Sequence, residues 1–220
     1  MPGATRVDRE RSALIIVDLQ PDFLPGGALA VEEGDVILPG IRRVMESGLF
    51  GLQAATQDWH PPDHVSFASN HEGARPMDEI ELYGHEQILW PDHCVQGTPG
   101  AELREDLPWE RVSVIVRKAS IRKVDSYSTF RNNWDPSGER PPTGLAGYLL
   151  ERGVEEIFLC GLARDFCVKW SAQDGVDAGF RVHVLWDLTR SVDPSADEDV
   201  RAGLEEKGVR VVESSGLSAA

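Results

Sequence analysis

The chain has 220 residues, enough for one large domain or two small ones, and 41% of them are hydrophobic, with 21 glycines besides. This composition is typical of a globular protein with a sizeable core and excludes global disorder. The 37 Asp and Glu residues outnumber the 22 Lys and Arg residues, which gives a net charge of −15. Phosphate backbones and anionic lipid headgroups repel such a chain, which argues against nucleic-acid and membrane-surface partners.

The N-terminal segment and the cysteines indicate the cellular compartment of the protein. Residues 1–12 are polar and charged and lack the apolar region of a secretion signal. No run approaches the roughly 18–20 apolar residues that span a bilayer. Cys94, Cys160 and Cys167 are irregularly spaced and odd in number, which does not suit a disulfide framework. We therefore expect a reduced, cytoplasmic protein with free thiols.

Six short apolar runs, rich in β-branched residues, are predicted to be strands. Within them apolar residues follow one another without alternation, which is typical of strands buried on both faces of a parallel sheet. The runs are Ala13–Val17, Gly51–Thr56, Val112–Val116, Glu156–Cys160, Arg181–Leu185 and, more weakly, Val209–Val212.

Four segments between these runs have apolar residues at helical spacing, and Gly153, Gly179 and Gly208, common helix stops, directly follow the last three. The segments are Asp35–Ser47, Thr143–Arg152, Cys167–Ala178 and Asp197–Lys207. Alternating strands and helices predict an α/β fold: a doubly wound, mainly parallel six-stranded sheet with helices on both faces.

Two stretches break this alternation. Trp59–Pro99 has little periodicity and contains five histidines and several prolines, and Lys123–Pro142 is polar. Long stretches without regular structure in compact domains are either functional or disordered. Because no repeat, low-complexity tract or linker is evident, we predict one domain over residues 1–220, with an insertion around residues 58–99.

Reactive side chains follow four of the predicted strands. Asp18 follows the first strand, Asp58 the second, Lys118 the third, and Cys167 lies a few residues beyond the fourth. Ligands of open α/β sheets bind at the carboxyl ends of the strands. The sequence therefore predicts a site where these four residues meet.

We expect different roles for the three cysteines. Cys160 closes an apolar strand, as buried structural cysteines often do. Cys167 lies near the start of a predicted helix, where the helix N-terminus lowers a thiol pKa and backbone N–H groups could form an oxyanion hole. It could also be a small core residue. Cys94, in a Pro-Asp-His-Cys segment, is a metal ligand or inert, and we favour inert.

Asp18 and Lys118 could activate a thiol. A carboxylate directly after a buried strand needs a partner or its pKa rises, and such a carboxylate beside a cysteine can act as a general base. Lys118 could pair with that carboxylate and stabilise the thiolate. The alternatives are a capping role for Asp18 and a solvated strand end for Lys118.

Carboxylate and imidazole groups in the irregular stretch indicate a metal site. Asp58 and His60 are two residues apart and point the same way in an extended chain, and His93 lies at the far end of the stretch. One carboxylate and two imidazoles suit Zn, Fe or Mn and leave positions open for water or substrate. His64 and His71 are further candidates.

Together these residues resemble the nicotinamidase/pyrazinamidase branch of the isochorismatase-like cysteine hydrolases. The similar segments stand in the family's order and span most of the chain. They are VDLQPDFLPGGALAV (17–31), TQDWHPPDHVSFASNH (56–71), WPDHCVQGTPGAEL (90–103), VDSYSTF (124–130) and CGLARDFCVKWSAQDG (160–175). The resemblance implies hydrolysis of nicotinamide, and also of pyrazinamide, through a cysteine thioester in NAD salvage. It further implies one divalent metal ion, zinc in the first place with iron or manganese as alternatives, and a homo-oligomer.

Carried over to this sequence, the resemblance implies a catalytic triad of Asp18, Lys118 and Cys167, with Lys118 placed by its distance from the VDSYS segment. It also implies a metal site with three protein ligands, of which Asp58 and His60 are the first two.

That third implied ligand is His93, and His64 matches a position that binds the metal in some members and contacts metal-bound water in others. The insertion around residues 58–99 would thus carry the metal site. By resemblance, these metal ligands distinguish this branch from the related isochorismatases, which lack them.

The resemblance also implies how substrate is held. Phe23 and Trp90 match the aromatic residues on either side of the ring, and Leu162 is counted with the substrate-binding residues. The bond between Leu162 and Ala163 matches a cis peptide. The backbone N–H groups of Ala163 and Cys167 match the oxyanion hole.

Two positions depart from the family pattern. Arg164 stands where threonine is common, which would direct it to solvent or to the pocket rim, and Pro21 stands where asparagine is frequent. Two other functions stay open on sequence alone. One is a metal-free isochorismatase-type or other amide hydrolase of this fold, acting on a different substrate. The other is a non-enzymatic module that binds metal or senses redox state through Cys167 as a reactive thiol.

Overall fold

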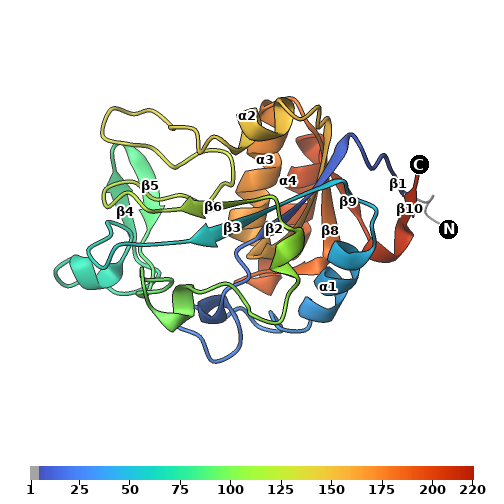
Figure 1. Cartoon of the computed structure of the whole chain (residues 1–220). Helices are drawn as coiled ribbons and strands as arrows, with labels where there is room; N and C mark the ends of the chain where they lie inside the picture. Colours follow the sequence, from blue (N-terminus) through green and yellow to red (C-terminus); the bar gives the residue numbers. More distant parts are fainter. Residues whose placement is uncertain (1–4) are drawn as a thin grey trace.

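The computed structural model describes residues 5–220, and its centre is a six-stranded parallel sheet (Figure 1). The strands lie in the order β6-β3-β2-β7-β8-β9. Their bounds are Ser12–Val17 (β2), Leu52–Asp58 (β3), Val114–Lys118 (β6), Glu156–Leu162 (β7), Arg181–Arg190 (β8) and Arg210–Val212 (β9). All six predicted strands are present, and the predicted doubly wound α/β sheet is confirmed.

The predicted helices are also present, with shorter bounds than the sequence pattern indicates. They are α1 (Leu38–Glu46), α2 (Leu145–Leu150), α3 (Lys169–Asp177) and α4 (Asp197–Glu206). Figure 1 shows α1 apart from the group formed by α2, α3 and α4. The two groups pack against opposite faces of the sheet, as the two separate core clusters show.

Strand β2 shows why the apolar runs of this chain are continuous. All six of its residues are buried. Leu14 and Ile16 belong to the core cluster that includes α1, whereas Ile15 and Val17 belong to the cluster under α2, α3 and α4. Because successive side chains of a strand point to opposite faces, a strand covered on both faces must be apolar at every position.

Four further strands lie outside the main sheet, and the sequence pattern did not predict them. Strands β4 (Glu79–Leu82) and β5 (His85–Ile88) form an antiparallel hairpin inside the stretch expected to be irregular. Its two-residue turn has both φ angles positive, 53° at Tyr83 and 82° at Gly84, as tight hairpin turns require. Strands β1 (Thr5–Val7) and β10 (Leu217–Ala219) pair in parallel near the two ends of the chain.

The sheet order determines where a site can form. The chain runs from β2 outward to β3 and β6, and then returns to β7 on the other side of β2. The order thus reverses between β2 and β7, and the crevice at the carboxyl ends of the strands at such a point is the usual ligand site of this fold. In Figure 1 the arrowhead of β3 points toward the β4–β5 hairpin, so the hairpin lies at this end of the sheet. Within residues 5–220, no helix has the length and apolar character needed to cross a membrane.

Candidate active site

Asp18, Lys118 and Cys167 meet at the carboxyl ends of β2, β6 and β7. The Nζ atom of Lys118 lies 2.9 Å from Asp18 Oδ2 and 3.7 Å from Cys167 Sγ. All three residues are buried, with Asp18 at 0% and Lys118 at 1% relative exposure. The alternatives of a solvated strand end for Lys118 and a turn cap for Asp18 do not fit this burial.

Asp18 is held in a setting that suits a general base. Its φ angle is 48°, and Thr56 Oγ1 donates a hydrogen bond to Asp18 Oδ1 at 2.7 Å. Burial raises the pKa of Asp18 to about 6, against the opposing effect of the Lys118 ammonium. A carboxyl group with such a pKa is ionised at neutral pH yet basic enough to accept a proton.

The surroundings of Cys167 correct one expectation. It lies in a π-helical turn, Arg164–Val168, that leads into α3, so it is near a helix start as predicted. Burial nevertheless raises the pKa of the Cys167 thiol well above its usual value, because it outweighs the nearby Lys118 charge. The expected lowering of this pKa is therefore wrong, and the thiol needs a base to become a nucleophile.

Lys118 is shared between two carboxylates. Besides Asp18, its Nζ atom donates to Asp58 Oδ1 at 2.5 Å and to the carbonyl oxygen of Ser126 at 3.2 Å. Burial acts to lower the pKa of Lys118, but Asp18 and Asp58 raise it further, so it stays well above the usual value. The register of the sheet explains the contact, because Asp58 and Lys118 are direct neighbours across β3 and β6. Both are the last residues of their strands, not residues beyond them as predicted.

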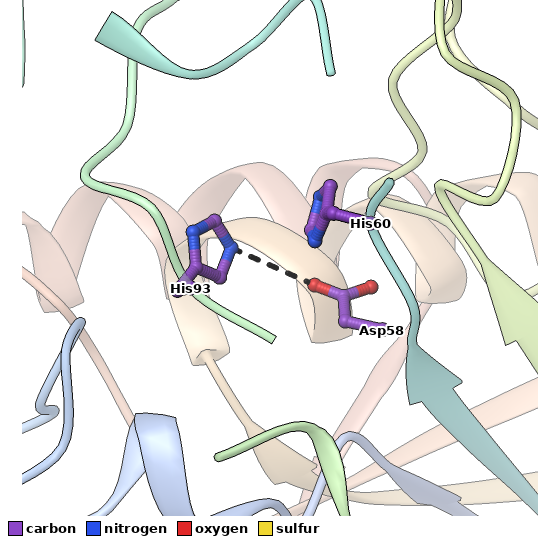
Figure 2. Close-up of side chains that lie close together, drawn as sticks. All are labelled: Asp58, His60 and His93. Carbon is purple, nitrogen blue, oxygen red and sulfur yellow. Dashed lines mark ion pairs between the residues drawn. The ribbon is translucent and has the colours of Figure 1, made fainter. Parts of the chain in front are cut away.

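Asp58, His60 and His93 form the second half of the site. Figure 2 shows the three side chains turned toward a common space, with Asp58 and His60 from the segment at the end of β3 and His93 from a separate part of the chain. One ligand atom from each lies within 4.8 Å of the others, and His93 Nε2 is 3.9 Å from Asp58 Oδ2. This is the grouping that the sequence pattern predicted.

The donor atoms of this trio fit a divalent metal ion. His93 Nδ1 lies 2.7 Å from the carbonyl oxygen of Pro91, which can only accept, so the proton is on Nδ1 and the Nε2 lone pair is free. His60 Nδ1 is buried without a hydrogen-bond partner. Burial lowers the pKa of His93 to about 4, which keeps this imidazole neutral, as a metal ligand must be.

The position of Asp58 is fixed by a residue that the sequence interpretation did not single out. Gln20 Oε1 accepts a hydrogen bond from the backbone N–H of Asp58 at 2.7 Å, and Gln20 Nε2 donates to the Asp58 carbonyl at 2.8 Å. The same Nε2 atom donates to the carbonyl of Ala101 at 2.9 Å. Gln20 therefore ties the end of β3 to the loop that follows β2.

His64 and His71 are placed differently from the trio. His64 Nε2 lies 3.2 Å from the carbonyl of Val124 and its Nδ1 lies 2.8 Å from Ser66 Oγ, so both ring nitrogens are engaged by protein groups. His64 groups with His60 and Asp125 instead of with Asp58. His71 Nε2 bonds to the carbonyl of Val65. Neither ring is grouped with Asp58 and His93 in this arrangement.

A cavity lies between the two halves of the site. Phe23 and Trp90 line it, as the resemblance implied, together with Ala163, Cys167 and the metal trio. Five further lining residues were not named from the sequence: Leu29, Asp125, Tyr127, Phe166 and Val192. Tyr127 and Phe166 stand in segments quoted for the resemblance, so their place in the motif was the available signal. Leu29 also lies in a quoted segment, whereas Val192 carries no such signal.

Leu162 and Arg164 are not on the wall of this cavity. The bond between Leu162 and Ala163 is a cis peptide, as the resemblance implied, but the Leu162 side chain is fully buried in the core cluster on the α1 side. Arg164 points neither to solvent nor to the cavity rim. Its guanidinium donates to Thr189 Oγ1 and to the Thr189 and Trp186 carbonyls, and it pairs with Asp197.

The other two cysteines are buried and free, and neither lines the cavity. Burial raises the pKa of Cys160 to values at which the thiol stays protonated. The backbone N–H of Cys94 donates to Asp22 Oδ2 at 2.7 Å, and burial raises the thiol pKa well above its usual value. Both observations agree with the expected inert roles.

Comparisons with known proteins agree with this geometry. Residues 12–215 match the family model described as Isochorismatase domain. The nicotinamidase of Acinetobacter baylyi is 46% identical over 181 residues, which cover 82% of this chain and 82% of that protein. The nicotinamidase of Escherichia coli is 40% identical over 195 residues, which cover 88% of this chain and 89% of that protein.

Solved structures of similar proteins superpose over nearly the whole chain. A nicotinamidase/pyrazinamidase of Acinetobacter baumannii has a TM-score of 0.87 and 40% identity, over 94% of this chain and 97% of its own. An L. infantum protein in complex with nicotinate has a TM-score of 0.86 and 40% identity, over 99% and 100%. A Pyrococcus horikoshii pyrazinamidase in complex with zinc has a TM-score of 0.73 and 36% identity, over 92% and 99%.

The chain therefore belongs to the isochorismatase family and, within it, to the nicotinamidases. This confirms the predicted family, fold and enzyme class.

Proposed function

We propose that this chain hydrolyses nicotinamide to nicotinate and ammonia through a thioester on Cys167, and that Asp58, His60 and His93 bind one divalent metal ion, zinc in the first place. The observation that carries the proposal is the position of Lys118 Nζ. It lies within 4 Å of Asp18, Asp58 and Cys167 at once, and so joins a nucleophile, its base and a metal-binding carboxylate at one cavity. The similar L. infantum structure contains nicotinate and the Pyrococcus horikoshii structure contains zinc, which supports this substrate and this metal.

The cavity suits a small, flat, neutral amide. Phe23, Trp90 and Phe166 supply aromatic walls, and Trp90 and Phe166 meet edge to face with centroids 4.8 Å apart. A planar heteroaromatic ring is expected to pack against these walls by aromatic contacts. Pyrazinamide has the same ring size and carboxamide, so we propose it as a second substrate.

The proposed reaction uses the chain's own groups in two stages. Asp18 accepts the Cys167 proton, and the thiolate attacks the carboxamide carbon to form a tetrahedral oxyanion. The backbone N–H groups of Ala163 and Cys167 bind the oxyanion, a contribution of about 3 kcal/mol for each donor. The carbon–nitrogen bond then breaks, and Asp18 returns the proton to the departing ammonia.

A thioester between Cys167 and the ring carbonyl remains after this stage. Asp18 accepts a proton from a water molecule, whose oxygen attacks the thioester carbon and releases nicotinate and the Cys167 thiol. The Lys118 ammonium balances the negative charge that moves between Asp18 and Cys167. A bound divalent ion would supply a Lewis acid that holds the ring nitrogen and orients the amide.

Release of ammonia from nicotinamide tests the proposal. The zinc-loaded chain should release ammonia and nicotinate in equal amounts, and the Cys167→Ala variant should release neither while it still binds zinc. Undiminished turnover by Cys167→Ala would overturn the mechanism. A zinc-loaded chain that is inactive on nicotinamide and pyrazinamide but active on another amide would overturn the substrate alone.

The proposal also covers the domain organisation and the cellular compartment of the protein. We propose that residues 1–220 work as one domain, because the two halves of the site come from β2, β3, β6 and β7 and from the 58–99 insertion. We also propose a reducing, cytoplasmic setting, which is supported by the three buried cysteines that remain free thiols.

A further inference from the structure

The β4–β5 hairpin sends one buried side chain toward the site. Gln87, on β5, is 5% exposed, whereas its neighbour Glu86 is exposed. The hairpin itself lies outside the six-stranded sheet (Figure 1). A buried amide on such a peripheral element needs partners, because an unpaired buried amide is costly.

The Gln87 amide nitrogen is placed among acceptors of the site. It lies 2.9 Å from Asp125 Oδ2, 3.0 Å from the hydroxyl oxygen of Tyr127 and 2.8 Å from the carbonyl of Ile88. The nitrogen has two protons for these three acceptors, so at least one proton is shared, and it lies between two side chains that both line the cavity.

Each of these two side chains leads to a different half of the site. Asp125 Oδ1 faces His60 Nε2 at 3.8 Å, and its carboxylate also accepts from the Ser126 backbone N–H at 2.8 Å. The 3.8 Å distance to His60 is longer than a hydrogen bond, but a carboxylate that faces a ring nitrogen favours a proton on that nitrogen and so biases the tautomer and orientation of the imidazole. Asp125 is thus placed to orient His60.

The other side chain, Tyr127, leads to the aromatic wall. The Trp90 indole N–H donates to the Tyr127 hydroxyl at 3.0 Å. The two rings are also packed edge to face, with centroids 6.2 Å apart. The hydroxyl that Gln87 fixes therefore fixes the indole that forms one side of the cavity.

The geometry points to Gln87 as a positioning residue that couples the metal-binding half of the site to the ring-binding wall, through Asp125 to His60 and through Tyr127 to Trp90. This inference rests on the proposed function. It gives the hairpin a role in the reaction, although none of its residues except Gln87 reaches Asp125 or Tyr127 by a hydrogen bond among those of the described chain.

The test compares Gln87→Leu and Gln87→Glu with a matched control, Glu86→Gln, on the same strand. Leucine removes the donor at similar size, and glutamate keeps the shape but faces Asp125 with a second carboxylate, so either variant serves if the other fails to fold. Zinc-loaded protein is mixed with excess chelator, without substrate, and the rate of zinc loss is measured. KM and kcat for nicotinamide are measured separately.

We expect zinc loss to be about 10-fold faster in both variants, as for other partners of metal-binding histidines. KM should rise by about 10-fold with kcat changed less than about threefold, since the hydrogen-bonded wall is lost but the thiol and its base are kept. Glu86→Gln should match the wild-type chain in all three measurements.

Zinc loss and KM that stay within twofold of the wild-type values in a folded variant would overturn the inference, even if the variant unfolds at a lower temperature. A change in only one of the two would also overturn it, because the link between the halves would be absent. Inactivity of the wild-type chain toward nicotinamide would count against the proposed function instead, since zinc loss is measured without substrate.

Discussion

Lys118 and Asp58 form a buried ion pair, with Nζ and Oδ1 2.5 Å apart, at adjacent positions of β6 and β3. Asp58 is the carboxylate of the proposed metal site, and Lys118 also contacts Asp18, the proposed base. The two halves of the site therefore share one ammonium group. A substitution of this lysine should therefore change the protonation of Asp18 more than it changes the shape of the cavity.

Replacement of Lys118 by methionine tests this relationship. Without the ammonium, the carboxylates of Asp18 and Asp58 face each other uncompensated, the pKa of Asp18 rises and the base is protonated at neutral pH. We expect kcat/KM for nicotinamide to fall by about 100- to 10,000-fold. Lys123→Met, at an exposed position, should retain wild-type activity. Activity of Lys118→Met within tenfold of the wild-type chain would show that the shared ammonium is dispensable.

The two buried thiols Cys167 and Cys160 offer a second comparison. Cys167 lines the cavity, whereas Cys160 lies in the core on β7. Cys167→Ala should abolish release of ammonia, and Cys160→Ala should keep kcat within about threefold because it leaves the reacting groups in place. The measurement is ammonia release per zinc-loaded site. Loss of activity in both variants together would indicate damage to the fold in place of loss of a nucleophile.

The pKa of Asp18 predicts the acid side of the pH profile. Burial raises this pKa to about 6. The required carboxylate form is present above that pH and is lost as the pH falls through it, so kcat/KM should decline by about tenfold for each pH unit below 6. The Cys167 pKa is raised well above its usual value, so its own titration adds no step to the profile near neutrality. A profile that stays flat down to pH 4 would contradict the role of Asp18.

Removal of the metal should act mainly on substrate binding and orientation. We expect chelator-treated protein to lose activity and to regain it when zinc is added back. His93→Gln should weaken zinc binding by at least about 10-fold, because one of three ligands is lost. His71→Gln is the matched control, since this ring bonds to a backbone carbonyl away from the trio. Equal zinc affinity in the two variants would rule out His93 as a ligand.

The buried contacts of Arg164 predict that its replacement lowers the stability of the fold. Its guanidinium bonds to Thr189, pairs with Asp197 and stacks on Trp186 with 3.8 Å to the ring centroid. Arg164→Ala should lower the free energy of unfolding by about 1–3 kcal/mol, because buried acceptors lose their donor and Asp197 keeps partial access to water. Denaturant unfolding measures this, with Arg122→Ala, an exposed arginine, as control. A loss no larger than that of the control would contradict the buried role of Arg164.

The main sheet could be predicted because its central strands are buried on both faces. Leu14, Ile15 and Ile16 in succession leave no polar face, and such a run is typical of a parallel strand. The same logic placed Asp18, Asp58 and Lys118 at one edge, since polar residues that end such runs must lie at the carboxyl ends. The side chains that carry chemistry were therefore predictable as a group.

The β4–β5 hairpin was not predictable by that logic. Its strands are short and mostly half-buried or exposed, so apolar residues such as Ile80 and Leu82 form only a brief alternation among charges. Gln87 became significant only when the fold placed it beside Asp125 and Tyr127. Contacts between segments about 40 residues apart, 38 from Gln87 to Asp125, leave no local pattern in the sequence.

The orientation of Arg164 and the pKa of Cys167 were also beyond the sequence. Both depend on burial, which is a property of the packed chain. An arginine in place of threonine indicated a departure, but its partners on β8 and α4 come from residues far along the chain. For Cys167, the sequence indicated the helix start and the nearby lysine, and burial reversed the expected direction of the pKa.

Detection of the thioester tests the central claim most directly. Zinc-loaded protein that is turning over nicotinamide is quenched in acid, and its peptides are analysed by mass spectrometry. The account predicts a nicotinoyl group on the peptide that contains Cys167, absent from the Cys167→Ala variant. Steady hydrolysis of nicotinamide with no adduct on that peptide, and with unchanged turnover by Cys167→Ala, would contradict it.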